Sequence, residues 1–352
     1  MQPPPAGALI LMQDIKELTL KSLEEKLRAF GAQAYHAQQI FTWIYRKATL
    51  DFRQMSDLPK DLRDKLKDNF YISGLKIVKR LQSSDGTQKL LFQSQDANLI
   101  EAVIIPAKDR VTACVSAQVG CKWACSFCAS GLKGFKRNLS CSEMLDEVLY
   151  LKKEALPLAL THLVFMGTGE PLDNYTQVLA AVKIINSPLG FNIGARRITL
   201  STSGIIPGIR KLAREGLQVE LSVSLHAAEE TLRSRLMPVN KKYPLQELIK
   251  ACKEYSAKTN RQITFEYILI KGVNSDLANA QSLSRLLEGW KLAKVNLIPS
   301  NVLSELKAGP PDKKKILFFK DYLIKQGIKV TLRKARGEDI NAACGQLRLN
   351  YA

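Results

Sequence analysis

The chain has 352 residues, of which 46% are apolar, and this is enough to bury a large core and excludes global disorder. No apolar run reaches the roughly 20 residues of a membrane span, and the first residues do not resemble a signal peptide. A formal net charge of +19 favours a polyanionic partner such as nucleic acid, although a basic surface can also serve solubility. Seven cysteines, three of them clustered, fit a metal centre in a reducing compartment, so we expect a cytoplasmic protein.

The first part of the chain has helical apolar spacing, from Asp14 to Phe70, with a third helix expected over Lys60 to Asn69. Gly31 separates the first two apolar stripes and suits a helix C-cap. The pattern then changes to period two, with Asp85-Gly86 as a hairpin turn between strands 76–81 and 88–92, followed by a strand over 99–105. We therefore predict a helical accessory domain over 1–74 and an antiparallel β linker over 75–106.

From residue 107 to residue 352, strands alternate with helical stretches. Repeated strand–helix units imply a parallel sheet, and about six units predict a partial (β/α)6 TIM-type barrel in an α/β protein. An open doubly wound sheet is the alternative. The expected strands are 111–116, 162–166, 197–200, 220–225, 263–270, 295–298 and 328–332, and the first expected helix, 142–153, has Ser140 or Ser142 as its N-cap.

Three cysteines with the spacing C-x3-C-x2-C follow the first of these strands, at Cys121, Cys125 and Cys128. Soft thiolates select zinc or an iron–sulfur cluster over hard cations. A zinc site and a complete cluster both usually take four ligands, so three cysteines would leave one iron of a 4Fe–4S cluster open. The spacing resembles the signature of the radical S-adenosylmethionine (SAM) superfamily, in which the open iron binds SAM. A zinc knuckle or three unrelated buried cysteines are the alternatives.

Polar motifs follow four of the predicted strands, at the end where barrel active sites lie. Glycines allow a close backbone approach to a ligand, and a glutamate can accept hydrogen bonds from an ammonium group. Each motif by itself also fits a plain turn, and His226 also fits a core residue. Together they resemble the SAM-binding set of radical SAM barrels, which comprises Gly169, Glu170, Ser201, Ser224, Leu225, His226 and Asn301.

Two further cysteines complete the pattern, Cys114 on the first barrel strand and Cys344 near the C-terminus. The segments TACVSAQVGCKWACSFCASGLKGFKRNL, GEPLDN and DINAACGQL resemble those of the RlmN family, the bacterial 23S rRNA and tRNA adenine carbon-2 methyltransferases. The resemblance covers nearly the whole chain. Thr168 departs from it, because the family usually has Met in this loop, which puts fine contacts in doubt. Related resistance enzymes that methylate carbon 8 share the cysteines, but GEPLDN is closer to the carbon-2 group.

The resemblance implies a mechanism with two cysteines and two SAM molecules per turnover. One SAM methylates Cys344, and a second, held on one 4Fe–4S cluster, gives a 5′-deoxyadenosyl radical that takes hydrogen from the S-methyl group. The resulting radical adds to adenine and forms a thioether link between Cys344 and the RNA. The methylated RNA is released when Cys114 attacks the Cys344 sulfur and forms a disulfide. Glu101 matches the family's proton acceptor, although the sequence does not distinguish it from an ordinary strand-edge glutamate.

The resemblance also implies partners, namely 23S rRNA, tRNA and a flavodoxin-like one-electron donor, for a monomer that needs no membrane. Basic residues near the expected active-site loops are candidates for phosphate contacts. A non-catalytic zinc RNA-binding protein and a radical SAM enzyme of another reaction class are the rival functions. The candidate phosphate contacts are Lys133, Lys136, Arg137, Arg196, Arg197, Arg233 and Arg235.

Overall fold

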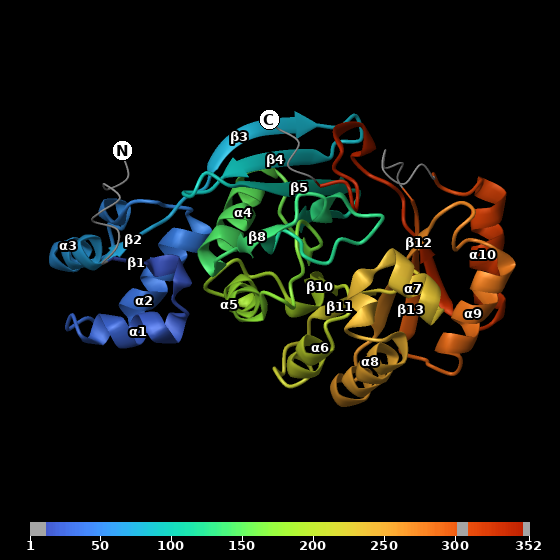
Figure 1. Cartoon of the computed structure of the whole chain (residues 1–352). Coiled ribbons are helices and arrows are strands. Elements are labelled where there is room, and N and C mark those ends of the chain that lie inside the picture. Colours follow the sequence, from blue (N-terminus) through green and yellow to red (C-terminus); the bar gives the residue numbers. More distant parts are fainter. Residues whose placement is uncertain (1–11, 301–308, 348–352) are drawn as a thin grey trace.

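The computed structural model describes residues 12–300 and 309–347 (Figure 1). A helical module comes first, as expected, and its third helix has the predicted bounds. Gly31 has φ +75° after the first helix, which fits its predicted role at the helix end. The helices are α1 (Leu20–Arg28), α2 (Ala34–Phe41), which continues into a π-helical segment (Thr42–Arg46), and α3 (Lys60–Asn69). Two short parallel strands that the sequence did not predict close the module, β1 (Gln13–Asp14) and β2 (Phe70–Tyr71).

The rest of the molecule is built on a ten-stranded mixed sheet, with the strand order β14-β13-β12-β11-β10-β9-β6-β5-β4-β3. The strands β6 and β9 to β14 run parallel, whereas β3, β4, β5 and β6 are joined antiparallel. The strands are β3 (Lys76–Gln82), β4 (Gln88–Gln93), β5 (Leu99–Ala107), β6 (Arg110–Cys114), β9 (His162–Phe165), β10 (Ile198–Thr202), β11 (Glu220–Ser224), β12 (Ile263–Leu269), β13 (Ala293–Pro299) and β14 (Lys329–Leu332).

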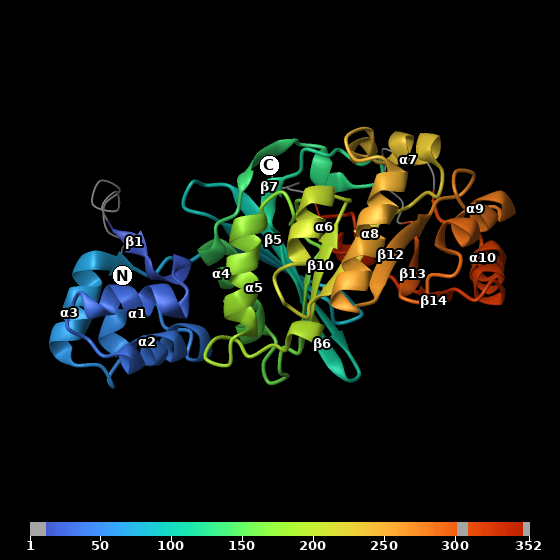
Figure 2. The same cartoon turned by 90° about the horizontal axis from the view of Figure 1, so that it is seen from below.

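Helices lie along the outside of this curved sheet, which confirms the partial barrel (Figures 1 and 2). The predicted hairpin around Asp85-Gly86 is confirmed as β3–β4, and its strands are continuous with the barrel sheet through β5 and β6. Ser140 is the N-cap of the first barrel helix, where its side chain accepts from Glu143 N. The helices are α4 (Cys141–Glu154), α5 (Tyr175–Asn186), α6 (Ile206–Leu212), α7 (Glu230–Leu236), α8 (Leu245–Thr259), α9 (Leu277–Leu287) and α10 (Lys313–Lys325).

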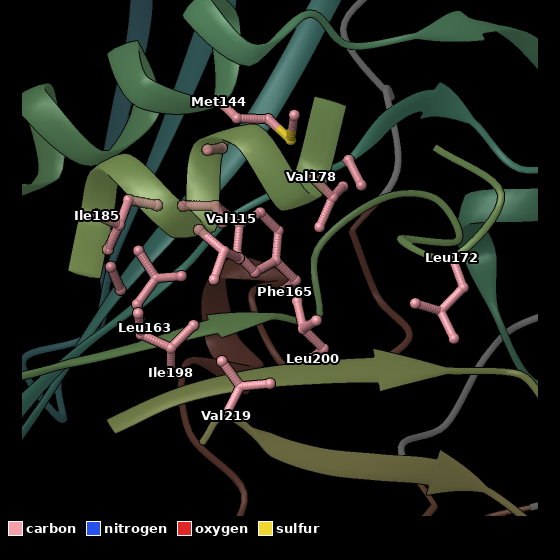
Figure 3. Packing of buried hydrophobic residues seen from close by; sticks show 14 of the residues in the cluster. Val115, Met144, Leu163, Phe165, Leu172, Val178, Ile185, Ile198, Leu200 and Val219 are labelled. Atoms are coloured by element: carbon pink, nitrogen blue, oxygen red, sulfur yellow. The ribbon is translucent and has the colours of Figure 1, made fainter. Parts of the chain in front are cut away.

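The core between the sheet and its helices is apolar, as Figure 3 shows for Leu163, Phe165 and Leu200 from the strands and Met144 and Val178 from the helices. Burial of such side chains stabilises the fold by roughly 1.5–3 kcal/mol each. None of the helices in residues 12–300 and 309–347 is both long and apolar enough to cross a membrane.

The helical module docks on α4 through buried polar contacts. Lys16 and Asp146 form an ion pair in which both side chains are buried, and Glu17 accepts a hydrogen bond from Ser142 N at 2.9 Å. Charges are buried at low cost only when they are paired, so this contact fixes one docking position.

Candidate active site

An open cavity lies at the carboxyl ends of the barrel strands, where active sites of barrel enzymes lie. Many of the predicted residues meet there although they come from separate loops. The cavity is lined by Cys121, Cys125, Cys128, Gly169, Glu170, Ser201, Ser224, His226 and Cys344. Leu225, Cys114 and Glu101 are buried beside it without lining it, and Asn301 lies outside the described residues.

The three-cysteine loop lies between two short antiparallel strands that the sequence did not predict, β7 (Gln118–Gly120) and β8 (Phe135–Asn138). Trp123 Nε1 donates to Asp173 Oδ2 at 2.6 Å, which ties the loop to the segment after Glu170. Ala129 N donates to Gly345 O at 2.7 Å, which ties it to the segment carrying Cys344. The cysteine loop is therefore held from both sides of the cavity.

The three thiols fit an iron–sulfur cluster. Burial raises the pKa of Cys121 to about 12, and burial, then the charges of Cys128 and Cys121, raise that of Cys125 well above its usual range. With pKa values this high the thiols are neutral in the protein alone, and they lose their protons when they bind a cationic centre. No group of three His, Cys, Asp or Glu side chains in the described ranges is arranged to hold a metal ion.

The Gly169-Glu170 turn lies against Gln118 at the start of β7. Gly169 has φ +103°, and a Cβ there would meet Gln118 Cβ at 2.5 Å, so only glycine fits. Glu170 Oε2 accepts from Ser203 N at 2.6 Å, and burial raises the pKa of its carboxyl. Thr168 contributes through its backbone, with its N donating to Ser116 Oγ at 2.9 Å, and its side chain does not line the cavity. Thr168 therefore takes no part in the lining of the cavity.

His226 combines the two alternatives that the sequence left open. It has φ +58°, and its Nδ1 accepts from Ile268 N at 3.0 Å, so it is a buried residue with a satisfied hydrogen bond. Its ring also lines the cavity and lies edge-on to Phe127, with ring centroids 4.4 Å apart. Burial lowers the pKa of His226 to about 3, so the ring is neutral at physiological pH.

The two outlying cysteines lie close to each other at the edge of the cavity. Cys114 packs with Ala342 and Leu347 from the C-terminal segment that carries Cys344. Burial, and then the charge of Cys344, raise the pKa of Cys114 to about 12, so Cys114 rests as a neutral thiol. Both cysteines are free thiols in this structure. One thiol facing the cavity and a second behind it form an arrangement suited to thiol–disulfide chemistry.

Two charged residues of the cavity were missed by the sequence analysis. Arg333 follows β14 and lines the cavity, and its Nη1 lies 3.7 Å from Met166 Sδ. The charge of Cys344, and also those of Glu266 and Cys114, raise the pKa of Arg333. Glu266 points inward from β12 and accepts from Asn296 Nδ2 at 2.8 Å. Two features of the sequence could have indicated these residues. Glu266 is an acidic residue inside an otherwise apolar predicted strand, and Arg333 directly follows the last predicted strand.

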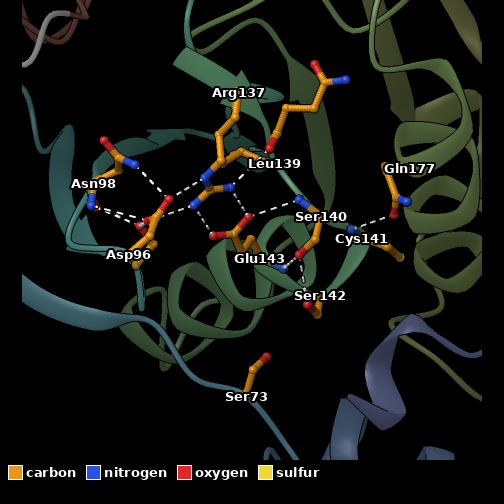
Figure 4. A network of polar contacts seen from close by, with 12 residues as sticks. Ser73, Asp96, Asn98, Arg137, Leu139, Ser140, Cys141, Ser142, Glu143 and Gln177 are labelled. Carbon is orange, nitrogen blue, oxygen red and sulfur yellow. Dashed lines mark hydrogen bonds and ion pairs between the residues drawn. The ribbon is translucent and has the colours of Figure 1, made fainter. Parts of the chain in front are cut away.

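Two of the predicted phosphate contacts have structural roles. Figure 4 shows Arg137 between Asp96 and Glu143, with both carboxylates bonded to its guanidinium. The prediction for Arg233 was wrong, because its side chain is fully buried. The physical reason is a set of acceptors that only the folded chain gathers around it. Its guanidinium donates to Ser203 O (2.8 Å), Ser224 O (3.0 Å), Leu225 O (3.2 Å) and Asn240 Oδ1 (2.6 Å).

Replacing Arg233 with Met is expected to lower the free energy of unfolding by about 3 kcal/mol, because several buried carbonyls lose a charged donor. Since those carbonyls belong to loops that line the cavity, affinity for SAM should also fall. Denaturant unfolding and SAM titration measure both effects. Arg235→Met is the matched control, because Arg235 is exposed on the same helix, and its stability should change by less than about 0.5 kcal/mol. Equal stability of the two variants would contradict this role.

Comparison with known proteins agrees with this geometry. Residues 115–280 match the radical SAM superfamily model, and residues 13–72 match the ribosomal RNA large subunit methyltransferase N-terminal domain. Probable dual-specificity RNA methyltransferases RlmN from Thermoanaerobacter sp. (strain X514) and Clostridium novyi (strain NT) are 48% and 45% identical to the chain. Both alignments cover 97% of this chain and 99% of the relative.

A solved structure supports the same assignment at the level of the whole fold. The crystal structure of a radical SAM methyltransferase from Sphaerobacter thermophilus superposes with a TM-score of 0.91 at 47% identity, covering 96% of this chain and 99% of that one. Membership of the superfamily implies SAM and an iron–sulfur cluster as cofactors. The chain therefore belongs to the RlmN family of radical SAM, dual-specificity RNA methyltransferases.

Proposed function

We propose that this enzyme methylates carbon 2 of adenosine in 23S rRNA and in tRNA, with one 4Fe–4S cluster and two SAM molecules per turnover. The observation that carries the proposal is the position of Cys344, which lines the same cavity as the three cluster cysteines, with Cys114 packed against its segment. A thiol that only served packing would have no reason to face this cavity.

Cys121, Cys125 and Cys128 would hold the cluster, and Gly169, Glu170, Ser201, Ser224 and His226 would surround SAM. SAM bound at the cluster supplies the methyl group for Cys344 and the radical that activates it. Because His226 stays neutral and Glu170 lies within hydrogen-bonding range of backbone amides, both can orient the polar groups of a ligand.

The cysteines complete the reaction in a balanced way. After the methylene carbon on Cys344 has joined the adenine ring, Glu101 would take the proton of the ring carbon, and the unpaired electron of the adduct would return to the one-electron carrier that supplied it. Cys114 would then lose its thiol proton and attack the Cys344 sulfur, and the electron pair of the broken sulfur–carbon bond would go to the methylene carbon, which gains a proton and becomes methyl. Two thiols are oxidised to a disulfide while the carbon is reduced. Burial raises the pKa of Glu101 to about 7, which suits a general base at neutral pH.

The remaining parts of the proposal concern partners and organisation. Carbon 2 is inaccessible in a stacked helix, so the target adenosine would be in a loop or would be turned out on binding. We propose a flavodoxin-like electron donor, a monomeric enzyme in the cytoplasm, and the domain division 1–74, 75–106 and 107–352. The net charge of +19 supports binding to a polyanion.

The test is the identity of the product nucleoside. Reconstituted enzyme should be incubated with SAM, a reductant and either a 23S rRNA fragment or tRNA, and the digested RNA analysed by mass spectrometry against methyladenosine standards. We expect 2-methyladenosine from both RNAs. A product methylated at carbon 8 would support the related resistance chemistry, and RNA binding without any methylated product would support a non-catalytic protein. A product from one RNA alone would restrict the substrate range.

A further inference from the structure

A buried lysine, Lys89 on β4, is 3% exposed and contacts two parts of the proposed catalytic machinery. Its Nζ lies 3.1 Å from Glu101 Oε1. The same ammonium donates to the carbonyl of Asn341 at 3.0 Å, three residues before Cys344. Burying an ammonium group costs free energy unless the group is paired and hydrogen-bonded. Packing alone therefore does not explain the buried position of Lys89.

Strand register places Lys89 on the face of the sheet that carries the catalytic groups. In the β4–β5 ladder Lys89 is opposite Val103, and Leu91 is opposite Glu101. In the β5–β6 ladder Val103 is opposite Cys114. Because residues directly opposite each other share a face, as do residues two apart, Lys89, Glu101 and Cys114 all point to the same side. Cross-strand pairing thus connects the lysine to the resolving cysteine.

The C-terminal segment packs on this face and is attached to the β3–β4 hairpin by several contacts. Gly337 N donates to Asp85 Oδ2 at 3.1 Å, and Ser84 N donates to Asp339 Oδ2 at 3.1 Å. Gly337 has φ +63°, and a Cβ there would meet Thr87 at 2.9 Å. The contact from Lys89 to Asn341 therefore lies between these anchors and Cys344.

We propose that Lys89 is a positioning residue that keeps the Glu101 carboxylate ionised and holds the Cys344 segment against it. Glu101 and the Cys344 sulfur then face one adenine from fixed directions. In the deprotonation step the proton of the ring carbon moves to Glu101, the electron pair of that bond stays with the adenine, and the unpaired electron of the radical adduct returns to the one-electron carrier. This inference rests on the proposed carbon-2 methylation and adds a residue to it.

The electrostatics predict the sign of a pH effect. Burial raises the pKa of Glu101, and the Lys89 charge is the opposing influence. Among the described residues, Lys89 is the charged group that acts on the pKa of Glu101. Cys114 lies on the same face of the sheet, and Glu147 on α4 accepts from Ser116 N at 2.8 Å. Ser116 Oγ in turn donates to Glu101 O at 2.7 Å. Removing the Lys89 charge therefore raises the pKa of Glu101 further, and the base becomes ionised only at higher pH.

The experiment measures methylated RNA formed by Lys89→Met, as full-length reconstituted enzyme, between about pH 6 and pH 9. We expect the ascending limb of the pH profile to move up by about 1, so that product at pH 7 falls about fivefold and recovers near pH 9. Lys89→Arg should stay close to the unaltered enzyme, because it keeps the charge. Lys76→Met is the matched control, because Lys76 is exposed on β3 of the same hairpin.

A second variant separates the contact of Lys89 with Glu101 from its contact with Asn341. It also replaces Lys89→Met in the test if that variant does not fold. Lys89→Gln retains a donor for Asn341 but loses the charge, so it should show the pH shift with normal hydrogen exchange over residues 336–347, whereas Lys89→Met should show faster exchange there. An unshifted pH profile in both uncharged variants would overturn the inference. Absence of methylated RNA from the unaltered enzyme at every pH would instead refute the proposed function.

Discussion

Cys114→Ala enzyme is expected to become covalently joined to its RNA and to stop there. If Cys344 carries the methylene bridge to adenine, only a second thiol can attack the Cys344 sulfur and release the product. Cys114 is the thiol in place for that step, because it packs against the segment bearing Cys344. Turnover should fall by about 10³-fold or more, as is usual when one member of a catalytic unit is removed.

The crosslink should appear as a band of reduced mobility in denaturing gels that disappears after nuclease treatment. Cys344→Ala should give neither product nor crosslink, and the double variant should behave like Cys344→Ala, since the methyl-bearing step comes first. Cys252→Ala is the matched control, because Cys252 is also buried, on α8, and does not line the cavity. Normal turnover by Cys114→Ala, without a crosslink, would refute the assigned roles even if the cluster and SAM sites were correct.

Loss of any one of Cys121, Cys125 or Cys128 should abolish the cluster and all methylation. Reconstitution of the unaltered protein with iron and sulfide under anaerobic conditions should give a brown protein with about four irons per chain, as a 4Fe–4S centre requires. Each alanine variant should bind almost no iron, because the cysteine loop contributes three thiols and a cluster held by only two of them would be labile. Iron content and visible absorbance measure this directly.

Two controls make the cluster prediction specific. Cys141→Ala should retain its iron, because Cys141 is buried at the start of α4 and does not line the cavity. The three cluster variants should unfold at denaturant concentrations close to that of the unaltered protein without iron, since the loop is also held by Trp123 and Ala129. A colourless preparation that binds one zinc per chain would contradict the assignment and favour the zinc alternative.

Local patterns in the sequence predicted most of the fold. Alternating apolar residues on either side of Asp85-Gly86 predicted β3 and β4, and the helical stripes predicted the N-terminal module, because both signals arise between residues only a few positions apart. The strands β7 and β8 were missed, since three or four residues are too short to show a period. The parallel pairs of β1 with β2 could not be predicted either, because the partners are more than fifty residues apart.

The sequence by itself determined the chemistry available to this protein, because the cysteine spacing and the motifs around Cys114 and Cys344 lie in short continuous segments. Only the tertiary structure decided which charged side chains serve that chemistry. Arg233 was predicted to face RNA and instead holds the loops under the cavity, while Lys89 gave no local signal and lies between Glu101 and Asn341. The physical reason is that the free energy of a buried charge depends on partners brought near it by strand register and loop path, and these partners are distant in the chain.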